Sequence, residues 1–387
     1  MKFISVNNWV TLLFYLYFIS TLLFPTIFFN KLIFVIIISF TVINYKLYRL
    51  NTISPFIILL IFLYGFLFSF FNNVDSVLRE QFFFSVLVLF LIYPIIYYKI
   101  DIEKIAKVSG LIIAAYTALS FLIVIIFIDM PFSEPYYVFF ENYSSGSNGL
   151  REFAEEGVIS FHIGTVPFLY LPLILFVISF VEKKKFSSLI AILIIFITIF
   201  VSGSRGSVLT SICATIMIIF FKSKFITKII FFAISIPLLT ILFTYLITNT
   251  SVFDTQEASN TVKIGHYESF FDHLNFFNFF LGEGLASYYY SKGVQAIKAH
   301  TELTPLDMLR YFGFILTPLL YFYIIFPTKK IFNYLNKNSL YLLLVLIYVL
   351  NSITNPTMFN SYGLLIILWY WYKILDNSNG KYEMTLI

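Results

Sequence analysis

The chain has 387 residues, of which 60% are hydrophobic and only 12% are charged, with a formal net charge of +5. So few polar side chains cannot cover a water-soluble globule, and this excludes a soluble enzyme built around one core. The single cysteine, Cys213, excludes an intrachain disulfide and a cysteine-based metal site.

Apolar runs of roughly 18 to 22 residues recur along the chain, which is the length that a helix needs to cross a bilayer. The first run has no small-residue cleavage site after it, so we expect a retained helix and not a signal peptide. In chain order the expected spans are 10–27, 29–44, 53–71, 82–98, 108–128, 158–180, 187–201, 207–221, 229–247, 305–326, 339–355 and 361–375. The pattern predicts an all-α integral membrane protein, a single polytopic domain over residues 1–387 with about 12 transmembrane helices (about 11–13).

The links between these runs alternate in charge. Most lysines fall in short links on one side, for example 99–107, 183–185 and 222–228, and most acids fall on the other side. We expect a protein of a bacterial inner membrane, and the positive-inside rule predicts that the lysine-rich links and both termini lie in the cytoplasm. Two longer outer segments, 129–157 and 249–304, are then expected to be periplasmic loops.

The second of these loops contains a helical period of apolar residues separated by charged ones. We expect it to form an amphipathic helix that lies on the membrane surface and ends at 282–284. The apolar residues are Val262, Ile264, Tyr267, Phe270, Phe271, Leu274 and Phe277.

The arginines are distributed differently from the lysines, because four of the five are predicted on the outer side: Arg79, Arg151, Arg205 and Arg310. A guanidinium group binds phosphate through two parallel hydrogen bonds. The distribution therefore indicates a phosphorylated ligand at the outer face. Alternatively, each arginine extends to lipid headgroups or pairs with an outer acid.

Arg205 lies in the short link Ser202-Gly203-Ser204-Arg205-Gly206 between two apolar runs. Because the link is short, Ser204 or Gly206 must lie near the start of the next helix, where free N–H groups favour an anion. The alternative is an ordinary hairpin turn.

A second cluster of polar residues runs from His300 to Arg310 at the start of another membrane helix. Thr304 as N-cap and Pro305 at the first helical position predict the helix start. Arg310 is within pairing reach of Asp307 and more than one turn inside the membrane helix, where ionisable groups usually face a functional cavity. Asp307 is alternatively only a capping carboxylate.

His300 and Glu302 precede this helix and are both candidates for a general base toward a hydroxyl group. A solvated loop histidine without a catalytic role is the alternative. The pair His266 and His273 has no third ligand at metal-site spacing, so no metal site is predicted.

Four segments resemble the bacterial O-antigen and capsule polymerases, a family related to the O-antigen ligases. They are SGSRG at 202–206, FFLGEGLASYYYSKG at 279–293, HTELTPLDMLRYFG at 300–313 and NPTMFNSYG at 355–363. The resemblance extends over residues 196–326, together with the last of these segments. It implies a GT-C-like membrane fold and an enzyme that needs no metal or cofactor.

The resemblance also implies a reaction and its participants. The enzyme would be a glycosyltransferase that joins undecaprenyl-diphosphate-linked oligosaccharide repeat units at the periplasmic face. Its partners would be these lipid-linked sugars, membrane lipid, a chain-length regulator and the repeat-unit flippase, with no nucleic acid.

Residue roles follow from the matching positions. Arg205 and Arg310 are implied to hold the lipid diphosphate, with Arg151 and Lys263 as further candidates. Lys263 stands where many relatives have arginine. The resemblance also implies that Glu302 and Asp307 are functionally important. His300 stands at the position of the histidine base that is proposed for ligases.

Two other functions are open. A ligase would transfer finished glycan to the lipid A core. A transporter or flippase for lipid-linked oligosaccharide would be expected to carry polar groups at mid-membrane depth in several helices.

Overall fold

The computed structural model describes residues 6–25, 28–43, 52–127, 129–140, 142, 150–153, 158–161, 163–226, 258–328, 339–353 and 355–379, with single residues and pairs between 228 and 244. The described chain is mostly helical. Its first half contains α1 (Val6–Leu23), α2 (Phe29–Ile43), α3 (Ser54–Phe68), η2 (Ser69–Phe71), α4 (Ser76–Ser85), η3 (Val86–Leu91), α5 (Ile92–Tyr97), α6 (Ile102–Phe121), η4 (Leu122–Ile126) and α7 (Ser133–Phe139).

Two antiparallel hairpins interrupt the helices of the second half, β1 (Leu150–Phe153) with β2 (Val158–Phe161), and β3 (Tyr289–Ser291) with β4 (Ala296–Lys298). The helices are η6 (Val166–Leu169), α8 (Tyr170–Lys183), α9 (Phe186–Val201), α10 (Arg205–Lys222), α12 (Ala258–His273), α13 (Phe276–Leu281), α14 (Thr304–Ile325), α16 (Ser339–Asn351) and α17 (Ser361–Asn379).

Seven helical segments of the described chain are long and apolar enough to cross a membrane. They are Val6–Leu23, Ser54–Phe71, Ser76–Tyr97, Ile102–Val124, Val166–Lys183, Arg205–Lys222 and Thr304–Ile325, and shorter apolar helices are Phe29–Ile43, Phe186–Val201 and Ser339–Asn351. This confirms a multi-pass helical membrane protein, whereas the predicted number of about 12 spans stays a prediction. The span expected at 229–247 lies largely outside the described residues.

The span expected at 158–180 is wrong at its beginning. Residues Val158–Phe161 form strand β2, and the α-helical part starts only at Tyr170 after the short helix η6. Pro167 lies in the first turn of η6, where a missing N–H is tolerated, so the proline marks a start and not a helix interior.

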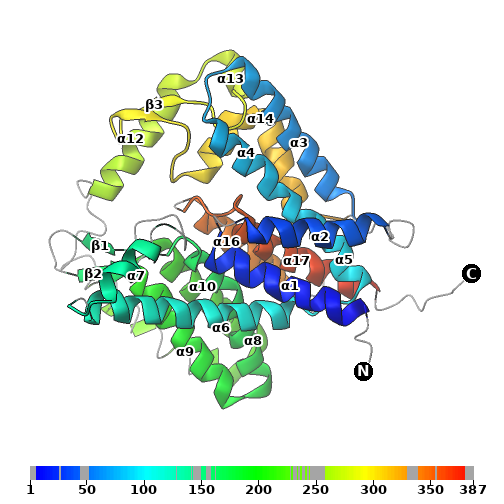
Figure 1. Cartoon of the computed structure of the whole chain (residues 1–387), viewed down its shortest axis with the longest axis vertical. Helices are drawn as coiled ribbons and strands as arrows, with labels where there is room; N and C mark the ends of the chain where they lie inside the picture. Colours follow the sequence, from blue (N-terminus) through cyan, green and yellow to red (C-terminus); the bar gives the residue numbers. More distant parts are fainter. Residues whose placement is uncertain are drawn as a thin grey trace, which may run out of the picture.

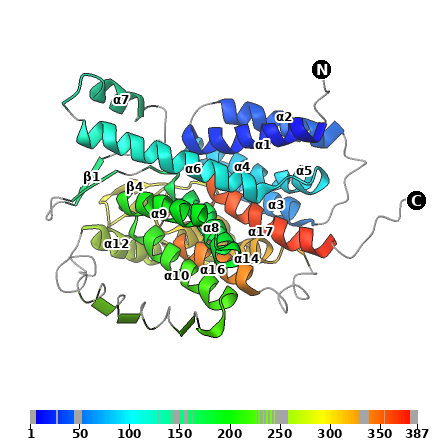
Figure 2. The same cartoon turned by 90° about the horizontal axis from the view of Figure 1, so that it is seen from below.

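The helices form two groups with α17 between them (Figures 1 and 2). In one group α14 packs against α3 and α13, and α3 packs against α4; in the other, α8 packs against α6, α9 and α10. Helix α17 contacts α5, η3, α16 and α1, and its residues Leu364 to Trp371 are buried. A helix that is apolar all round belongs in such a central position.

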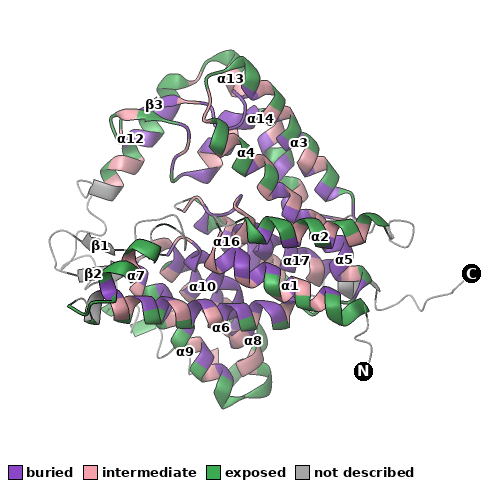
Figure 3. Cartoon of the chain, in the orientation of Figure 1, coloured by how far each residue is buried: buried purple, intermediate pink, exposed green. Residues whose placement is uncertain are grey.

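The outward faces of the helices are apolar, as expected where lipid is the solvent. Figure 3 shows exposed residues along the outer sides of α3 and α9. On these two helices the large exposed side chains are Phe56, Leu60, Leu63, Leu67, Phe186, Ile190, Leu193, Ile194, Ile197 and Phe200.

Residues 258–303 lie across the ends of α3, α4 and α14 (Figure 1). The amphipathic helix expected here is two helices, because α12 ends at His273 and the side chain of Asn275 accepts a hydrogen bond from the Asn278 N–H to start α13. The expected end of the amphipathic helix at 282–284 therefore applies to α13, whose C-cap residue is Gly282. The expected apolar face is also divided: Phe270 is buried against the protein, whereas Ile264, Tyr267, Phe271 and Phe277 are exposed.

Candidate functional site

The site is built on a break in helix α14. Gly313 has a positive φ of 72°, which interrupts the helical hydrogen bonds and leaves upstream carbonyl groups without their usual donors. The loop after α13 supplies new donors: the Glu283 N–H bonds to the Arg310 carbonyl at 2.8 Å, and the Gly284 N–H bonds to the Tyr311 carbonyl at 3.0 Å. The loop and the first turns of α14 are therefore held as one unit.

Arg310 is the centre of this unit, and its side chain is only 3% exposed. One terminal nitrogen donates to the carbonyl and the hydroxyl of Ser287, and the other donates to the Ala299 carbonyl at 2.7 Å. The guanidinium carbon lies 4.5 Å from the centre of the Tyr289 ring and 4.8 Å from that of Tyr311. A buried charge needs such a set of partners to offset the loss of water.

Asp307 is the counter-charge. Its Oδ1 is 3.3 Å from the second terminal nitrogen of Arg310, so the predicted Asp307–Arg310 pairing is present. Its Oδ2 accepts from the Thr301 N–H at 2.8 Å and from the Thr301 hydroxyl at 3.0 Å. Asp307 therefore ties the preceding loop to α14 and does more than cap a helix.

The predicted start of α14 is wrong by one residue. Leu303 is the N-cap residue, Thr304 is the first helical residue, and the Leu303 N–H bonds to the Thr301 hydroxyl at 3.0 Å. Within the described part of the chain the Thr304 hydroxyl has no hydrogen-bond partner. Thr301 supplies the local hydrogen bonding because its hydroxyl both accepts from Leu303 and donates to Asp307.

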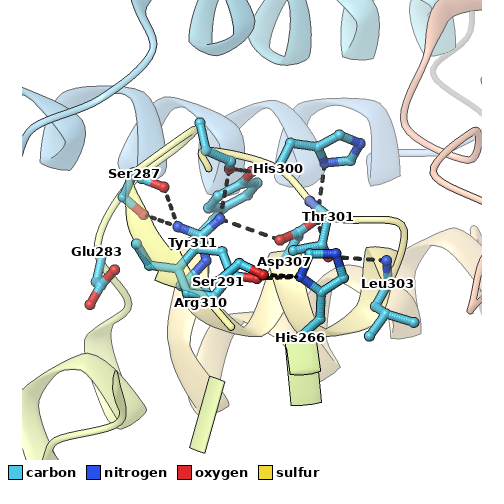
Figure 4. A network of polar contacts seen from close by, with 12 residues as sticks. His266, Glu283, Ser287, Ser291, His300, Thr301, Leu303, Asp307, Arg310 and Tyr311 are labelled. Carbon is cyan, nitrogen blue, oxygen red and sulfur yellow. Dashed lines mark hydrogen bonds and ion pairs between the residues drawn. The ribbon is translucent and has the colours of Figure 1, made fainter. Parts of the chain in front are cut away.

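His300 joins the cluster at its open side. Its Nδ1 is 2.9 Å from the Oδ2 of Asp307, which is an ion-pair distance without the angle of a hydrogen bond, and its side chain is 26% exposed. Phe82 packs against the imidazole with ring centres 5.6 Å apart. In Figure 4 the other ring nitrogen points away from the network. A carboxylate this close to an imidazole stabilises the positive charge that forms when the outer nitrogen takes a proton.

Behind this dyad lies a layer of neutral polar groups on α12 and β3. The Nδ1 of His266 is 2.7 Å from the Ser291 hydroxyl and 3.2 Å from the Tyr289 hydroxyl. Burial lowers the pKa of His266 from its ordinary 6.5, and burial together with Asp307 raises the pKa of Tyr289 to about 12. These groups support the network without carrying charge at neutral pH.

Glu283 is a residue of the site that the sequence analysis did not single out. Its carboxylate is buried, with Oε1 2.7 Å from the Nε2 of His273 and in contact with the Asn278 side-chain amide. The Asn72 amide donates to the Glu283 carbonyl at 2.7 Å. The available signal was the Gly282-Glu283-Gly284 sequence, a carboxylate between two residues that favour unusual backbone angles.

Glu302 and Lys263 form a separate, outer pair. The Lys263 Nζ is 3.9 Å from the Glu302 Oε2, and the Glu302 side chain is 53% exposed. An exposed pair at this distance contributes little to stability. Glu302 therefore lies outside the buried network that contains His300 and Asp307.

Arg205 is the first residue of α10 with Ser204 as N-cap, so the predicted helix start in SGSRG is confirmed. The Ser204 hydroxyl is 2.9 Å from that of Ser207 and 3.4 Å from the Oδ1 of Asn355, which joins SGSRG to the NPTMFNSYG turn. The contacts described for Arg310 do not include Arg205. That both arginines hold the same diphosphate stays a prediction. Arg151 pairs with Ser160 between β1 and β2, but its side chain lies outside the described residues.

Among the described residues, no three His, Cys, Asp or Glu side chains are grouped to hold a metal ion. The nearest approach to such a group is the pair of separate carboxylate–imidazole contacts, His300 with Asp307 and His273 with Glu283.

The helices define a multi-pass membrane protein, and a buried polar network lies beneath the loop at the end of three of them. Comparison with known proteins finds a similarity to the O-antigen polymerase of Shigella flexneri, with 26% identity over 217 residues. The match covers 54% of this chain and 52% of the relative, so it spans about half the length of that protein. No protein-family model matches the chain, and no solved structure matches it significantly.

Proposed function

We propose that this protein is a glycosyltransferase that polymerises lipid-linked oligosaccharide repeat units. The observation that carries the proposal is the His300–Asp307 dyad, with its outer ring nitrogen directed away from the buried network. The similarity to an O-antigen polymerase and the family segments at 279–293 and 300–313 support the same reaction.

In the proposed reaction a hydroxyl group of the acceptor unit attacks the anomeric carbon of the donor sugar. The hydroxyl proton passes to the outer nitrogen of His300, while Asp307 stabilises the imidazolium. The bond between the anomeric carbon and the phosphate oxygen breaks, and the undecaprenyl diphosphate leaves. The donor is already activated, so the step draws on no nucleotide, metal or cofactor.

Arg205 is proposed to stabilise the charge on the leaving diphosphate, aided by the N-terminus of α10. Arg310 was expected in the same role, but its burial and its contacts with Ser287, Ala299 and Asp307 favour a positioning role. Arg310 would hold Asp307 and hence His300 in place. Glu302, which pairs with Lys263, is the less favoured base.

The proposal places the site at the periplasmic face of the inner membrane, with both termini in the cytoplasm. The acceptor would be a second lipid-linked unit, and a chain-length regulator and the flippase would act beside the enzyme. A ligase that uses the same histidine base is the nearest alternative.

The test is a polysaccharide gel from a strain that lacks the gene and carries wild type, His300→Gln, Asp307→Asn or Arg205→Ala. Loss of a general base lowers rates by roughly 10²–10⁴-fold. We therefore expect a single-repeat band from His300→Gln and Asp307→Asn, and the same band from Arg205→Ala because the charge on the leaving diphosphate would lose its stabilising group, whereas wild type gives a ladder. The protein level of each variant is measured beside the gel. Glu302→Gln is the matched control and is expected to give a ladder.

Two results would contradict the proposal. A wild-type ladder from His300→Gln would show that the dyad is structural. Bare core with accumulated lipid-linked polymer in the deletion strain would show a ligase.

A further inference from the structure

Arg79 on α4 lies between two aromatic rings. Its guanidinium carbon is 4.8 Å from the centre of the Phe66 ring and 4.6 Å from that of Phe70, and its side chain is only 12% exposed. Contact with two rings stabilises the charge and holds the guanidinium plane in place. The rings contribute no hydrogen-bond acceptor of the usual kind.

The polar contacts of Arg79 are few for a group so deeply buried. One terminal nitrogen is 3.8 Å from the Oε1 of Glu80, a side chain that is itself 56% exposed, and the Nε has no hydrogen-bond partner within the described residues. The Nε of Arg310 also has no partner within the described residues, but the terminal nitrogens of Arg310 donate to two carbonyl groups and a hydroxyl. A buried N–H donor without an acceptor is unfavourable, and the Nε of Arg79 is such a donor.

The surface next to Arg79 is apolar and open. Phe70 on η2, whose ring contacts Arg79, and Leu67, three residues before it on α3, expose large fractions of their side chains. A fixed cation beside such a surface, near the ends of two membrane helices, matches a molecule with a phosphate head and a hydrocarbon chain.

Arg79 is also close to the candidate site along α4. Phe82, three residues further on and thus on a neighbouring face of the helix, packs against His300. At the start of α4, Val74 pairs with Ser287, the residue that accepts from Arg310. A lipid phosphate at Arg79 would therefore lie about one helical turn from the level of the proposed base.

We propose that Arg79 binds the phosphate of a lipid-linked substrate, with the hydrocarbon chain against the surface formed by Leu67 and Phe70. The identification of the lipid as substrate rests on the proposed function. Polymerisation needs two lipid-linked molecules, and Arg79 and Arg205, on different helix groups, provide one phosphate contact for each.

The test measures binding of farnesyl diphosphate and of farnesol to the full-length protein in detergent, for wild type, Arg79→Gln, Arg79→Lys and Glu80→Gln. A charge-assisted hydrogen bond changes affinity by about tenfold or more. We expect Arg79→Gln to weaken farnesyl diphosphate binding by about that factor without affecting farnesol, and Arg79→Lys to weaken it less.

Glu80→Gln is the matched control. If Arg79 only pairs with Glu80, this variant will behave like Arg79→Gln, which would overturn the proposal. If Arg79 binds phosphate, Glu80→Gln will bind as tightly as wild type or more tightly. Thermal unfolding of each variant shows whether a loss of binding comes from misfolding, and Arg79→Lys, which keeps the charge, remains informative if Arg79→Gln does not fold.

A competitor distinguishes a substrate from bulk lipid. If short-chain phosphatidylglycerol displaces farnesyl diphosphate at equal concentration, with the same dependence on Arg79, the site binds ordinary headgroups and the substrate assignment is wrong. If binding depends on Arg79 and the diphosphate is preferred, the phosphate site at Arg79 is supported. This holds even if the polysaccharide gel contradicts the polymerase function.

Discussion

Asp307 and Arg310 lie three residues apart on α14 and are both almost completely buried. Removing one partner of a buried charge pair costs roughly 3–5 kcal/mol, because the other charge is left without compensation. Asp307→Asn keeps the hydrogen-bonding shape toward Thr301, which alanine would not, but it also leaves the charge of Arg310 without compensation, so its protein level is measured beside its activity. The sequence spacing predicted the pair, but not the carbonyl groups of Ser287 and Ala299 that make its burial possible.

His266 makes the stability of the protein depend on pH. Burial lowers its pKa below the ordinary 6.5, against the opposing charges of Asp307 and Glu302, so folding favours the neutral ring. Its stabilising contribution is complete above pH 6.5 and is lost as the pH falls through the lowered pKa, because only the unfolded chain takes up the proton there. We expect the unfolding temperature to fall between pH 7 and pH 5.

The measurement is thermal unfolding of the purified protein in detergent across this pH range, for wild type and His266→Asn. The variant is expected to be less stable at pH 7 and to show a smaller loss on acidification. An unchanged pH dependence in His266→Asn would mean that another group is responsible.

At the scale of elements, the junction of the α13 loop with α14 depends on two glycines. Gly282 and Gly313 have φ values of 78° and 72°, and a Cβ at either position would collide with backbone atoms, those of Tyr311 or Phe280. With ψ near 180° as well, this backbone region is essentially restricted to glycine and costs other residues on the order of 1–3 kcal/mol before any collision is counted.

We expect Gly282→Ala and Gly313→Ala each to lower the unfolding temperature by several degrees and to weaken polymer formation, because the Glu283 and Gly284 hydrogen bonds to α14 would be displaced. Thermal unfolding and the polysaccharide gel are the measurements. The matched control is Lys184→Gly at the end of α8, where a non-glycine residue has a φ of 50°. That change is expected to leave the unfolding temperature unchanged or raise it, and a fall as large as that of Gly313→Ala would contradict the argument.

The element boundaries show what local patterns predict well. The start of α10 at Arg205 follows from a short polar link between two apolar runs, whereas the division of 258–281 into α12 and α13 does not. There the apolar period continues across the break and conceals the local signal, the N-cap Asn275, while the inward packing of Phe270 depends on the rest of the fold.

At the scale of the whole molecule, the apolar outer faces and the buried helix α17 agree with a protein surrounded by lipid. The orientation across the membrane is a prediction from the lysine-rich links, including the one between α8 and α9. The loop that carries the candidate site is expected on the opposite side from these links.

Cysteine labelling tests this orientation, because Cys213 is the only native cysteine and can be replaced by serine. In that background we expect Val294→Cys, in the exposed turn between β3 and β4, to react with an impermeant maleimide in cells whose outer membrane is permeable. Lys185→Cys, exposed between α8 and α9, is expected to react only after the inner membrane is opened. The reverse pattern would place the candidate site in the cytoplasm.

The sequence by itself determined the class of this protein and several helix positions. Membrane helices are long apolar runs, and hydropathy follows directly from composition along the chain. The tertiary structure decided which polar residues share a site. His300, Asp307 and Arg310 lie near one another in sequence, but Ser287 and Glu283 reach Arg310 only because Gly313 breaks α14 and the loop after α13 bonds to the carbonyl groups so released. Contacts of this kind arise from backbone geometry far along the chain, which no local pattern of residues encodes.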